Sequence, residues 1–337
     1  MPAEWERHEG TWLTWPQNSI TWPGAMLGKV ERIYARMIQS LLKGERVHLL
    51  VGTPAHARKV QRLLPRSAST QRLVFHKART VATWSRDYGP IFVKRGAQLA
   101  FTKWIFNAWG GKYSDLARDT RVVDKLTALK DVRRWDPGIV LEGGSIDMDG
   151  QGTCLTTEQC LLNPNRNPSL DRRGIETYLK RYLGVQKTIW LKEGIEGDDT
   201  DGHVDDITRF VAPRTVLTAV EEDRADRNHA LLDENLRILR RQTDARGRRL
   251  RVVELPMPGR VGPARDDSPH DRLPASYANF YIGNAVILLP IYSHRNDKRA
   301  VNIVKKLFKG RQVVPIECTP LVYGLGSIHC VSQQQPL

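Results

Sequence analysis

Short β-like runs alternate with amphipathic helical segments along the whole chain, and this alternation limits the fold more than any other feature. The clearest helical periodicity lies in five long segments, 26–43, 116–130, 169–183, 224–245 and 296–309, with a shorter helix near 55–64. Strand-like runs such as VHLLVG, GTCLTT and NAVILLPIY lie between the helices. The pattern predicts an α/β chain of roughly five units, about 65–70 residues each, although no identity between units is detectable.

No linker or low-complexity stretch interrupts this alternation, so we expect residues 1–337 to form a single domain. The hydrophobic content of 40% and the charged content of 26% are typical of a globular protein. Apolar runs such as AVILLPIY are too short to cross a membrane, and the first residues, MPAEWERHEG, lack the pattern of a signal peptide. The four cysteines show no CxxC spacing. We therefore expect a reduced, cytoplasmic protein.

The chain is strongly basic, with 52 Lys and Arg against 37 Asp and Glu and a formal net charge of +15. This charge keeps a nucleic-acid-binding protein without catalysis open as an alternative function. The basic residues are scattered over the helical segments, however, and the densest cluster, RRQTDARGRRLR (240–251), contains no aromatic residues. A solvated basic surface explains this distribution better, so nucleic acid is an unlikely partner.

The residues with the most chemistry fall in glycine-containing stretches at strand ends and turns. These stretches are TWSRDYGP (83–90), FNAWGGKY (106–113), LEGGSIDMDG (141–150), GDDTDGHVDD (197–206), LPASYANFY (273–281) and GSIHCVSQQQP (326–336). Their distribution predicts one site, assembled from loops at one end of a repeated scaffold.

Cys330 is the candidate nucleophile, because it follows a glycine-rich turn and is surrounded by polar residues. We interpret Cys154, Cys160 and Cys318 as small buried hydrophobic residues. A thiolate nucleophile needs an acid/base partner, usually histidine. We favour His203, which carboxylates flank on both sides, over His329, whose side chain would point away from Cys330 if 328–332 were extended.

Three carboxylates, Asp87, Glu142 and Asp205, stand in contexts that simple surface solvation explains poorly. Asp205 would share one face with His203 if the segment were extended. Buried carboxylates require a cation or hydrogen-bond donors. A guanidinium group suits several converging carboxylates, because it is planar, permanently charged and offers five N–H donors.

Metal sites fit the sequence less well. Aligning Gly202 with the turn glycine of a calcium loop places Thr208 at the position where glutamate is required. A zinc site from His203, Asp205 and Cys330 has suitable ligand types but no recognised spacing. We expect no metal.

Taken in order, these segments resemble the agmatine deiminase family, which is grouped with bacterial peptidylarginine deiminases in the guanidino-group-modifying enzyme superfamily. The resemblance covers nearly the whole chain, from WERHEGTWLTWP to IHCVSQQQP. The motifs W-x-R-D-x-G-P, FNAWGG, LEGGSID, LLNPNRNP, GDDTDGHVDD, LPASYANFY and G-x-IHC-x-x-QQ occur in the family order.

This resemblance implies a five-bladed α/β propeller (the pentein fold) with pseudo-fivefold repeats, and hydrolysis of a guanidine to a urea and ammonia without a cofactor. By motif position, Cys330 resembles the nucleophile and His203 the general acid/base. Asp87, Glu142 and Asp205 resemble the guanidinium-binding carboxylates.

The expected substrate is a small cationic guanidine, most simply agmatine. The acids Asp198, Asp199 and Asp201 and the indoles of Trp84 and Trp109 are candidates to receive its aminobutyl end. Gly326, in the turn before Cys330, is a further expected contact. The motifs contain no evident Arg pair for an α-carboxylate, which disfavours free arginine, but an arginine- or peptidylarginine-directed deiminase remains the alternative. The sequence does not fix the oligomeric state, and a homodimer is compatible with it.

Overall fold

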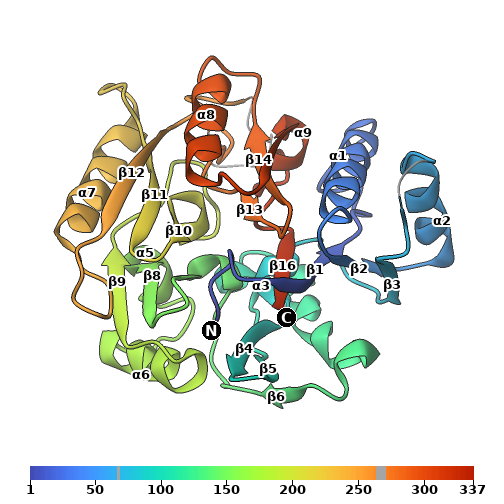
Figure 1. Cartoon of the computed structure of the whole chain (residues 1–337), viewed down its shortest axis with the longest axis horizontal. Helices are drawn as coiled ribbons and strands as arrows, with labels where there is room; N and C mark the ends of the chain where they lie inside the picture. Colours follow the sequence, from blue (N-terminus) through green and yellow to red (C-terminus); the bar gives the residue numbers. More distant parts are fainter. Residues whose placement is uncertain (67–68, 263–270) are drawn as a thin grey trace.

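The computed structural model describes residues 1–66, 69–262 and 271–337. The chain forms a mixed α/β structure with five small sheets (Figure 1). One sheet has four strands in the order β16-β1-β2-β3, and the other four have three strands each, in chain order. In every three-stranded sheet the first two strands pair antiparallel and the last two pair parallel. The same local plan therefore recurs along the chain, as the alternation predicts.

The strands of the first sheet are β1 (His8–Thr14), β2 (Arg46–Val51), β3 (Leu73–Lys77) and β16 (Ser332–Pro336). The second sheet contains β4 (Ile91–Arg95), β5 (Gln98–Thr102) and β6 (Arg133–Trp135), and the third contains β7 (Asp147–Met148), β8 (Thr153–Thr157) and β9 (Lys187–Leu191). The fourth contains β10 (Thr208–Ala212), β11 (Thr215–Val220) and β12 (Arg251–Pro256), and the fifth contains β13 (Tyr281–Ile282), β14 (Val286–Ile291) and β15 (Gln312–Glu317).

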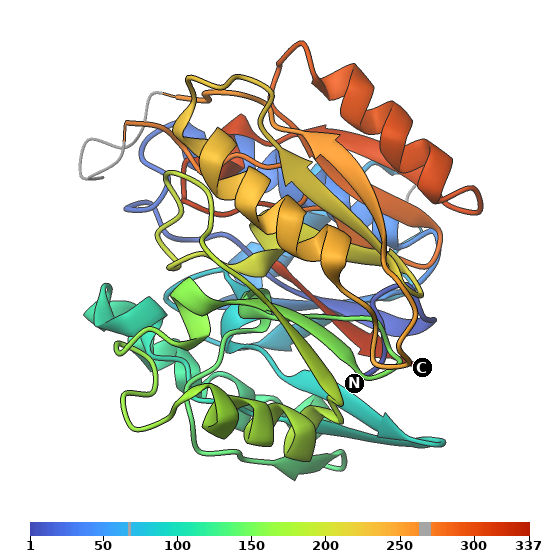
Figure 2. The ribbon, with the colours of Figure 1, turned by 90° about the vertical axis from the view of Figure 1, so that its left-hand side faces the viewer.

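A helical segment connects each pair of parallel strands, as a parallel crossover requires. The long helices in these connections are α1 (Met26–Leu41), α2 (Pro54–Leu63), α6 (Arg172–Leu183), α7 (Arg227–Arg241) and α8 (Asp297–Leu307). Figure 2 shows α7, in gold, lying along the outside of the molecule over its own sheet. Gly184 ends α6 in a left-handed conformation, with φ of 75°. The expected helices are thus confirmed at five positions out of six.

The prediction of a long helix over 116–130 is wrong. Three short 3₁₀ segments occupy this connection instead: η1 (Ser114–Arg121), η2 (Val123–Lys125) and η3 (Thr127–Leu129). The apolar periodicity does mark the buried side, because Val122, Val123, Leu126 and Leu129 pack into the core. The β-branched residues here disfavour a continuous helix, and the Asp119 carboxylate is drawn inward to accept hydrogen bonds from the backbone N–H groups of Val81 and Ala82.

The two ends of the chain meet in the first sheet, where the C-terminal strand β16 pairs antiparallel with β1. The Trp12 indole N–H adds a hydrogen bond to Gln335 Oε1 at 2.8 Å. Figure 1 accordingly shows both termini near the middle of the molecule, close to β16 and the short helix α3 (Ser85–Tyr88). The last strand is therefore fixed, and so is the turn that precedes it.

Apolar residues fill the space between sheets and helices in three clusters, but a buried ionic network lies where the sheets meet. Glu4 contacts Arg86 of α3 and Arg209 of β10, and it accepts a hydrogen bond from the backbone N–H of Ile282 in β13. Arg209 also pairs with Asp147 of β7, and Arg86 donates to Gln334 of β16. This network joins strands of four sheets to α3, the short helix that precedes the remaining sheet, so it fixes these elements relative to one another. Within the described residues, no helix is both long and apolar enough to pass through a membrane.

Candidate functional site

The Cys330 thiol lies in a turn just before β16. Residues 328–331 form this turn. The segment 328–332 is therefore not extended, contrary to the assumption under which His329 was compared with His203. The Asn279 side-chain N–H donates to Cys330 Sγ at 3.1 Å, and Asp205 Oδ2 lies 3.8 Å from the sulfur. Arg86 of α3 donates its backbone N–H to the Cys330 carbonyl at 3.2 Å. Contacts from three different loops therefore fix the thiol.

The predicted acid/base His203 and two predicted carboxylates converge on the backbone of Gly144. A Cβ atom at Gly144 would lie 2.6 Å from His203 Nδ1, 3.0 Å from Asp87 Oδ1 and 3.1 Å from Asp205 Oδ2. His203 Nδ1 and Asp87 Oδ1 are 3.8 Å apart. Residues 204–206 form a 3₁₀ turn (η5), so His203 and Asp205 meet through this turn and not along an extended strand as expected.

Asp87 is held in a defined orientation by two N–H donors. The Gly144 backbone N–H donates to Oδ1 at 3.0 Å, and the Trp109 indole N–H donates to Oδ2 at 2.9 Å. Trp109 has φ of 56° and ψ of 54°, a left-handed backbone conformation that residues other than glycine rarely adopt. Such strain costs about 1–3 kcal/mol and persists where surrounding contacts enforce it. Here it presents the indole N–H to Asp87.

Glu142 is fully buried and is paired with Arg166, which donates from Nε to Oε1 at 2.7 Å. The same guanidinium donates to Asp201 Oδ2 at 2.6 Å and to the Thr200 carbonyl at 2.8 Å. Arg166 therefore links Glu142 to the acidic loop that precedes His203. The second oxygen of Glu142, Oε2, is buried and has no hydrogen-bond partner among the described residues.

His329 shares Asp205 Oδ2 with the Cys330 thiol. Its Nδ1 lies 2.7 Å from Asp205 Oδ2, and its Nε2 lies 2.8 Å from Glu4 Oε2. The ring thus bridges Asp205 to the buried ionic network of the sheets. The extended segment that favoured His203 over His329 does not form, so the choice of His203 as the partner of the thiol stays a prediction.

Burial and charge change the protonation of the site. Burial raises the pKa of the Cys330 thiol well above its usual value, and the nearby carboxylates of Asp205, Asp206 and Asp87 raise it further. Burial also raises the pKa of Asp87 to about 6, although His203 opposes this shift. Burial opposes protonation of His203, yet Asp87, Cys160 and Glu142 together raise its pKa well above the usual value. Without a bound ligand these shifts favour a neutral Cys330 thiol and a charged His203 imidazole.

A cavity of about 350 Å³ leads to Cys330 and Asp87. The predicted contacts Trp84, Trp109, Asp199 and Gly326 all line it. Gly326 leaves room for the Trp84 indole, because a Cβ there would lie 2.5 Å from the ring. The cavity thus has aromatic walls and an anionic group, and its far end is the thiol.

Two of the three acids expected at the aminobutyl end do not line this cavity. Asp198 accepts hydrogen bonds from the backbone N–H groups of Thr200, Gly202 and His203 and so stabilises its own loop. Asp201 is paired with Arg166 and with Lys112. Only Asp199 of the three faces the cavity, at 3.8 Å from the Lys112 ammonium.

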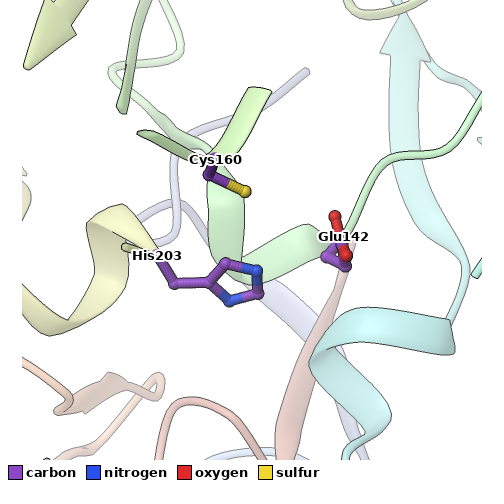
Figure 3. A group of neighbouring side chains, drawn as sticks. All are labelled: Glu142, Cys160 and His203. Atoms are coloured by element: carbon purple, nitrogen blue, oxygen red, sulfur yellow. The ribbon is translucent and has the colours of Figure 1, made fainter. Parts of the chain in front are cut away.

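Sequence reasoning missed several residues that hold the site together. Arg166 lies in the motif LLNPNRNP, and Asn279 lies in the motif LPASYANFY. Their place in these two motifs was the sequence signal that could have identified them as site residues. Cys160 is buried as expected, but its sulfur lies beside Glu142 and His203 (Figure 3). Glu4 gave no signal, because nothing near the N-terminus points to a contact with residue 329.

Known proteins support one family for this arrangement. A family model described as Porphyromonas-type peptidyl-arginine deiminase matches residues 1–336. An agmatine deiminase of Medicago truncatula is 37% identical over 366 residues, covering 100% of this chain and 96% of its own. The structure of the agmatine deiminase of Enterococcus faecalis has a TM-score of 0.91 and 32% identity, covering 100% of this chain and 95% of that one.

A more distant structure shares the fold alone. The inosamine-phosphate amidinotransferase of Streptomyces griseus has a TM-score of 0.52 at 13% identity and covers 99% of this chain and 95% of that one. The mixed α/β architecture with several small sheets is therefore common to both groups. The match over residues 1–336 and the close likeness over full length show that the chain belongs to the Porphyromonas-type peptidyl-arginine deiminase family.

Proposed function

We propose that this protein hydrolyses agmatine to N-carbamoylputrescine and ammonia through a covalent intermediate on Cys330. The observation that carries the proposal is a set of buried polar atoms on Glu142, Asp205 and His203 without hydrogen-bond partners in the part of the chain that the structure describes. Among the described residues, Glu142 Oε2, Asp205 Oδ1 and both ring nitrogens of His203 have no hydrogen-bond partner. Unpaired buried polar atoms cost about 1–3 kcal/mol each, so the two free carboxylate oxygens of this set favour a ligand that supplies N–H donors.

A guanidinium group supplies these donors in one plane. Asp87 and Asp205 hold its nitrogens in this proposal, and Glu142 and His203 complete the ring of partners. Arg166 fixes one oxygen of Glu142 at 2.7 Å and so directs the other toward the ligand. The planar cation would then lie between the carboxylates with its central carbon facing Cys330 Sγ.

The chemistry follows from this placement. The Cys330 thiolate attacks the central carbon, and protonated His203 gives its proton to the departing nitrogen, which leaves as ammonia. This forms an S-alkylthiouronium intermediate and leaves His203 neutral. His203 then takes a proton from water, whose oxygen attacks the same carbon. Collapse of that adduct passes its hydroxyl proton to the departing sulfur, which releases the urea product and regenerates the Cys330 thiol.

The substrate itself assists formation of the thiolate. Because buried carboxylates raise the pKa of Cys330 in the free protein, the thiol form dominates there. A bound guanidinium neutralises part of this negative charge and so favours the thiolate. The nucleophile is therefore produced where the substrate is already in position.

The outer part of the cavity favours an amine over a carboxylate at the far end of the substrate. Asp199 offers a negative charge, and Trp84 and Trp109 offer aromatic faces for a cation. Lys112 also lines the cavity, but it donates to Asp201 Oδ1 at 2.7 Å and to the Asp199 carbonyl at 2.6 Å. Its pairing makes it a poor receptor for the α-carboxylate of arginine.

The proposal extends to the fold and the cellular location. The five sheets would be the blades of a five-bladed α/β propeller, the pentein fold, which forms a single domain over residues 1–337. The recurring strand order and the ionic network that joins four of the sheets to α3 support this view. Four free, buried cysteines are consistent with a reducing, cytoplasmic environment.

The test is a ureido-product assay with agmatine, free arginine and an arginyl peptide. We expect the largest kcat/KM for agmatine and no turnover by Cys330→Ala. Cys318→Ala, which removes another buried thiol, serves as the matched control and should remain active. A preference for the peptide would overturn the substrate but keep the chemistry, whereas turnover by Cys330→Ala would overturn both.

A further inference from the structure

The Cys160 thiol lies in an unexpected position for a structural cysteine. Cys160 belongs to the short helix α5 (Glu158–Leu161), and the proposed reaction does not use it. One ligating atom each of Glu142, Cys160 and His203 lies within 4.8 Å of the other two, and all three residues are buried. Figure 3 shows the three side chains reaching toward a common space from separate segments of the chain.

These atoms are available to a ligand. Glu142 Oε2 and both nitrogens of His203 have no hydrogen-bond partner among the described residues. A second group of possible ligands has atoms that are already hydrogen-bonded. It consists of Asp205, Asp206 and Cys330. Asn279 donates to Asp206 Oδ1 at 2.9 Å and to Cys330 Sγ at 3.1 Å, and His329 occupies Asp205 Oδ2. The group around Cys160 is therefore the more open of the two.

We propose that Glu142, Cys160 and His203 form a binding site for a thiophilic divalent cation, with Zn²⁺ as the ion that fits best. Carboxylate, thiolate and imidazole are all ligands of Zn²⁺, which prefers four-coordinate tetrahedral geometry. Zinc bond lengths place neighbouring ligand atoms about 3.3–3.6 Å apart. The three ligand atoms, now within 4.8 Å of one another, would therefore have to approach by at most about 1–1.5 Å. The thiolate selects against Mg²⁺ and Ca²⁺, which prefer oxygen ligands.

The surroundings favour a divalent cation at this position. Arg166 hydrogen-bonds the other oxygen of Glu142 and fixes the orientation of that carboxylate, as outer partners of metal ligands commonly do. Asp87 lies 3.8 Å from His203 and adds negative charge. Three protein ligands leave a fourth position, which water would occupy. Binding releases two protons to solvent, the Cys160 thiol proton and one proton of the charged His203 imidazole.

Metal and substrate would exclude one another. Both require Glu142 Oε2 and His203, so Zn²⁺ at this site inhibits the enzyme in competition with the guanidine. This inhibitory effect rests on the proposed function, whereas the binding of the ion does not. The site is therefore a place where the availability of zinc would control turnover.

The test uses the full-length protein, titrated with Co²⁺ as a spectroscopic probe for Zn²⁺. We expect a thiolate-to-cobalt charge-transfer band of one-to-one stoichiometry that added Zn²⁺ removes. The band should persist in Cys330→Ala and in the matched control Cys154→Ala, and it should be absent from Cys160→Ala. A band lost in Cys330→Ala but kept in Cys160→Ala would overturn the site, and so would its absence from the unmodified protein.

A second variant keeps the proposal testable if Cys160→Ala fails to fold. Glu142→Gln keeps the shape of the side chain and should weaken Zn²⁺ binding in equilibrium dialysis by at least the roughly 10–100-fold that loss of an outer partner of a metal ligand costs. Unchanged affinity in Glu142→Gln would overturn the proposal. Zn²⁺ bound at this site with unchanged agmatine turnover would support the metal site and overturn the proposed position of the guanidinium.

Discussion

Replacement of Gly144 by alanine tests whether the site is as closely packed as the structure indicates. The added Cβ would lie 2.6 Å from His203 Nδ1 and 3.0 Å from Asp87 Oδ1. Ordinary contact begins near 3.4 Å, so the imidazole would have to retreat by roughly 0.8 Å. Because misplacement of reacting groups by about 1 Å costs about 100-fold in rate, we expect kcat/KM to fall by about that factor.

The stability of Gly144→Ala should change much less than its activity. Overpacking of a buried position costs about 1–3 kcal/mol, which leaves a domain of this size folded. Gly310→Ala is the matched control, since its added Cβ meets nothing within 4 Å. The measurements are the ureido-product assay and urea unfolding of both variants. A Gly144→Ala protein with kcat/KM within twofold of the unmodified protein would refute the convergence of His203, Asp87 and Asp205 on this residue.

Three further predictions concern residues that support the site. Burial raises the pKa of Asp119 to about 6, so the folded state binds a proton more tightly than the unfolded chain does. Relative to Asp119→Asn, the free energy of unfolding should therefore fall by about 2 kcal/mol between pH 4 and 6, and a flat difference in urea unfolding would contradict this. Arg166→Met leaves Glu142 buried without its cation and should cost about 3–5 kcal/mol in urea unfolding, whereas the exposed Arg172→Met should cost less than about 1 kcal/mol. Asn279→Ala removes the N–H donor to Cys330 Sγ and should lower kcat by about tenfold or more without comparable change in KM, so a pure KM effect would argue against its role in placing the thiol.

The elements that sequence periodicity located well are those with one apolar face. Helices α1, α7 and α8 begin and end within a few residues of the predicted bounds, because each packs one face against a sheet. The same signal failed to distinguish a helix from 3₁₀ turns over 116–130. There the buried side was predicted correctly, while the backbone hydrogen bonding depended on local β-branched residues and on the inward carboxylate of Asp119.

The elements that the sequence did not reveal lack an apolar pattern. Strand β16 has the sequence SQQQP, yet most of it is buried, because it pairs with β1 and faces β4 and α3. No local rule predicts a strand from three glutamines. The pairing of the two chain ends becomes visible only when the first sheet is assembled.

Local chemistry in the sequence determined which residues could react: a thiol after a glycine-rich turn, an imidazole among acids, and carboxylates in apolar or glycine-rich contexts. Tertiary structure alone decided how they are used. It placed His329 between Glu4 and Asp205 and brought Cys160 beside His203. It also directed the Asp198 side chain toward the backbone N–H groups of its own loop. Apart from the local Asp198 turn, these contacts join residues far apart in the chain. Their geometry depends on how the sheets pack around the ionic network, which no local stretch of sequence encodes.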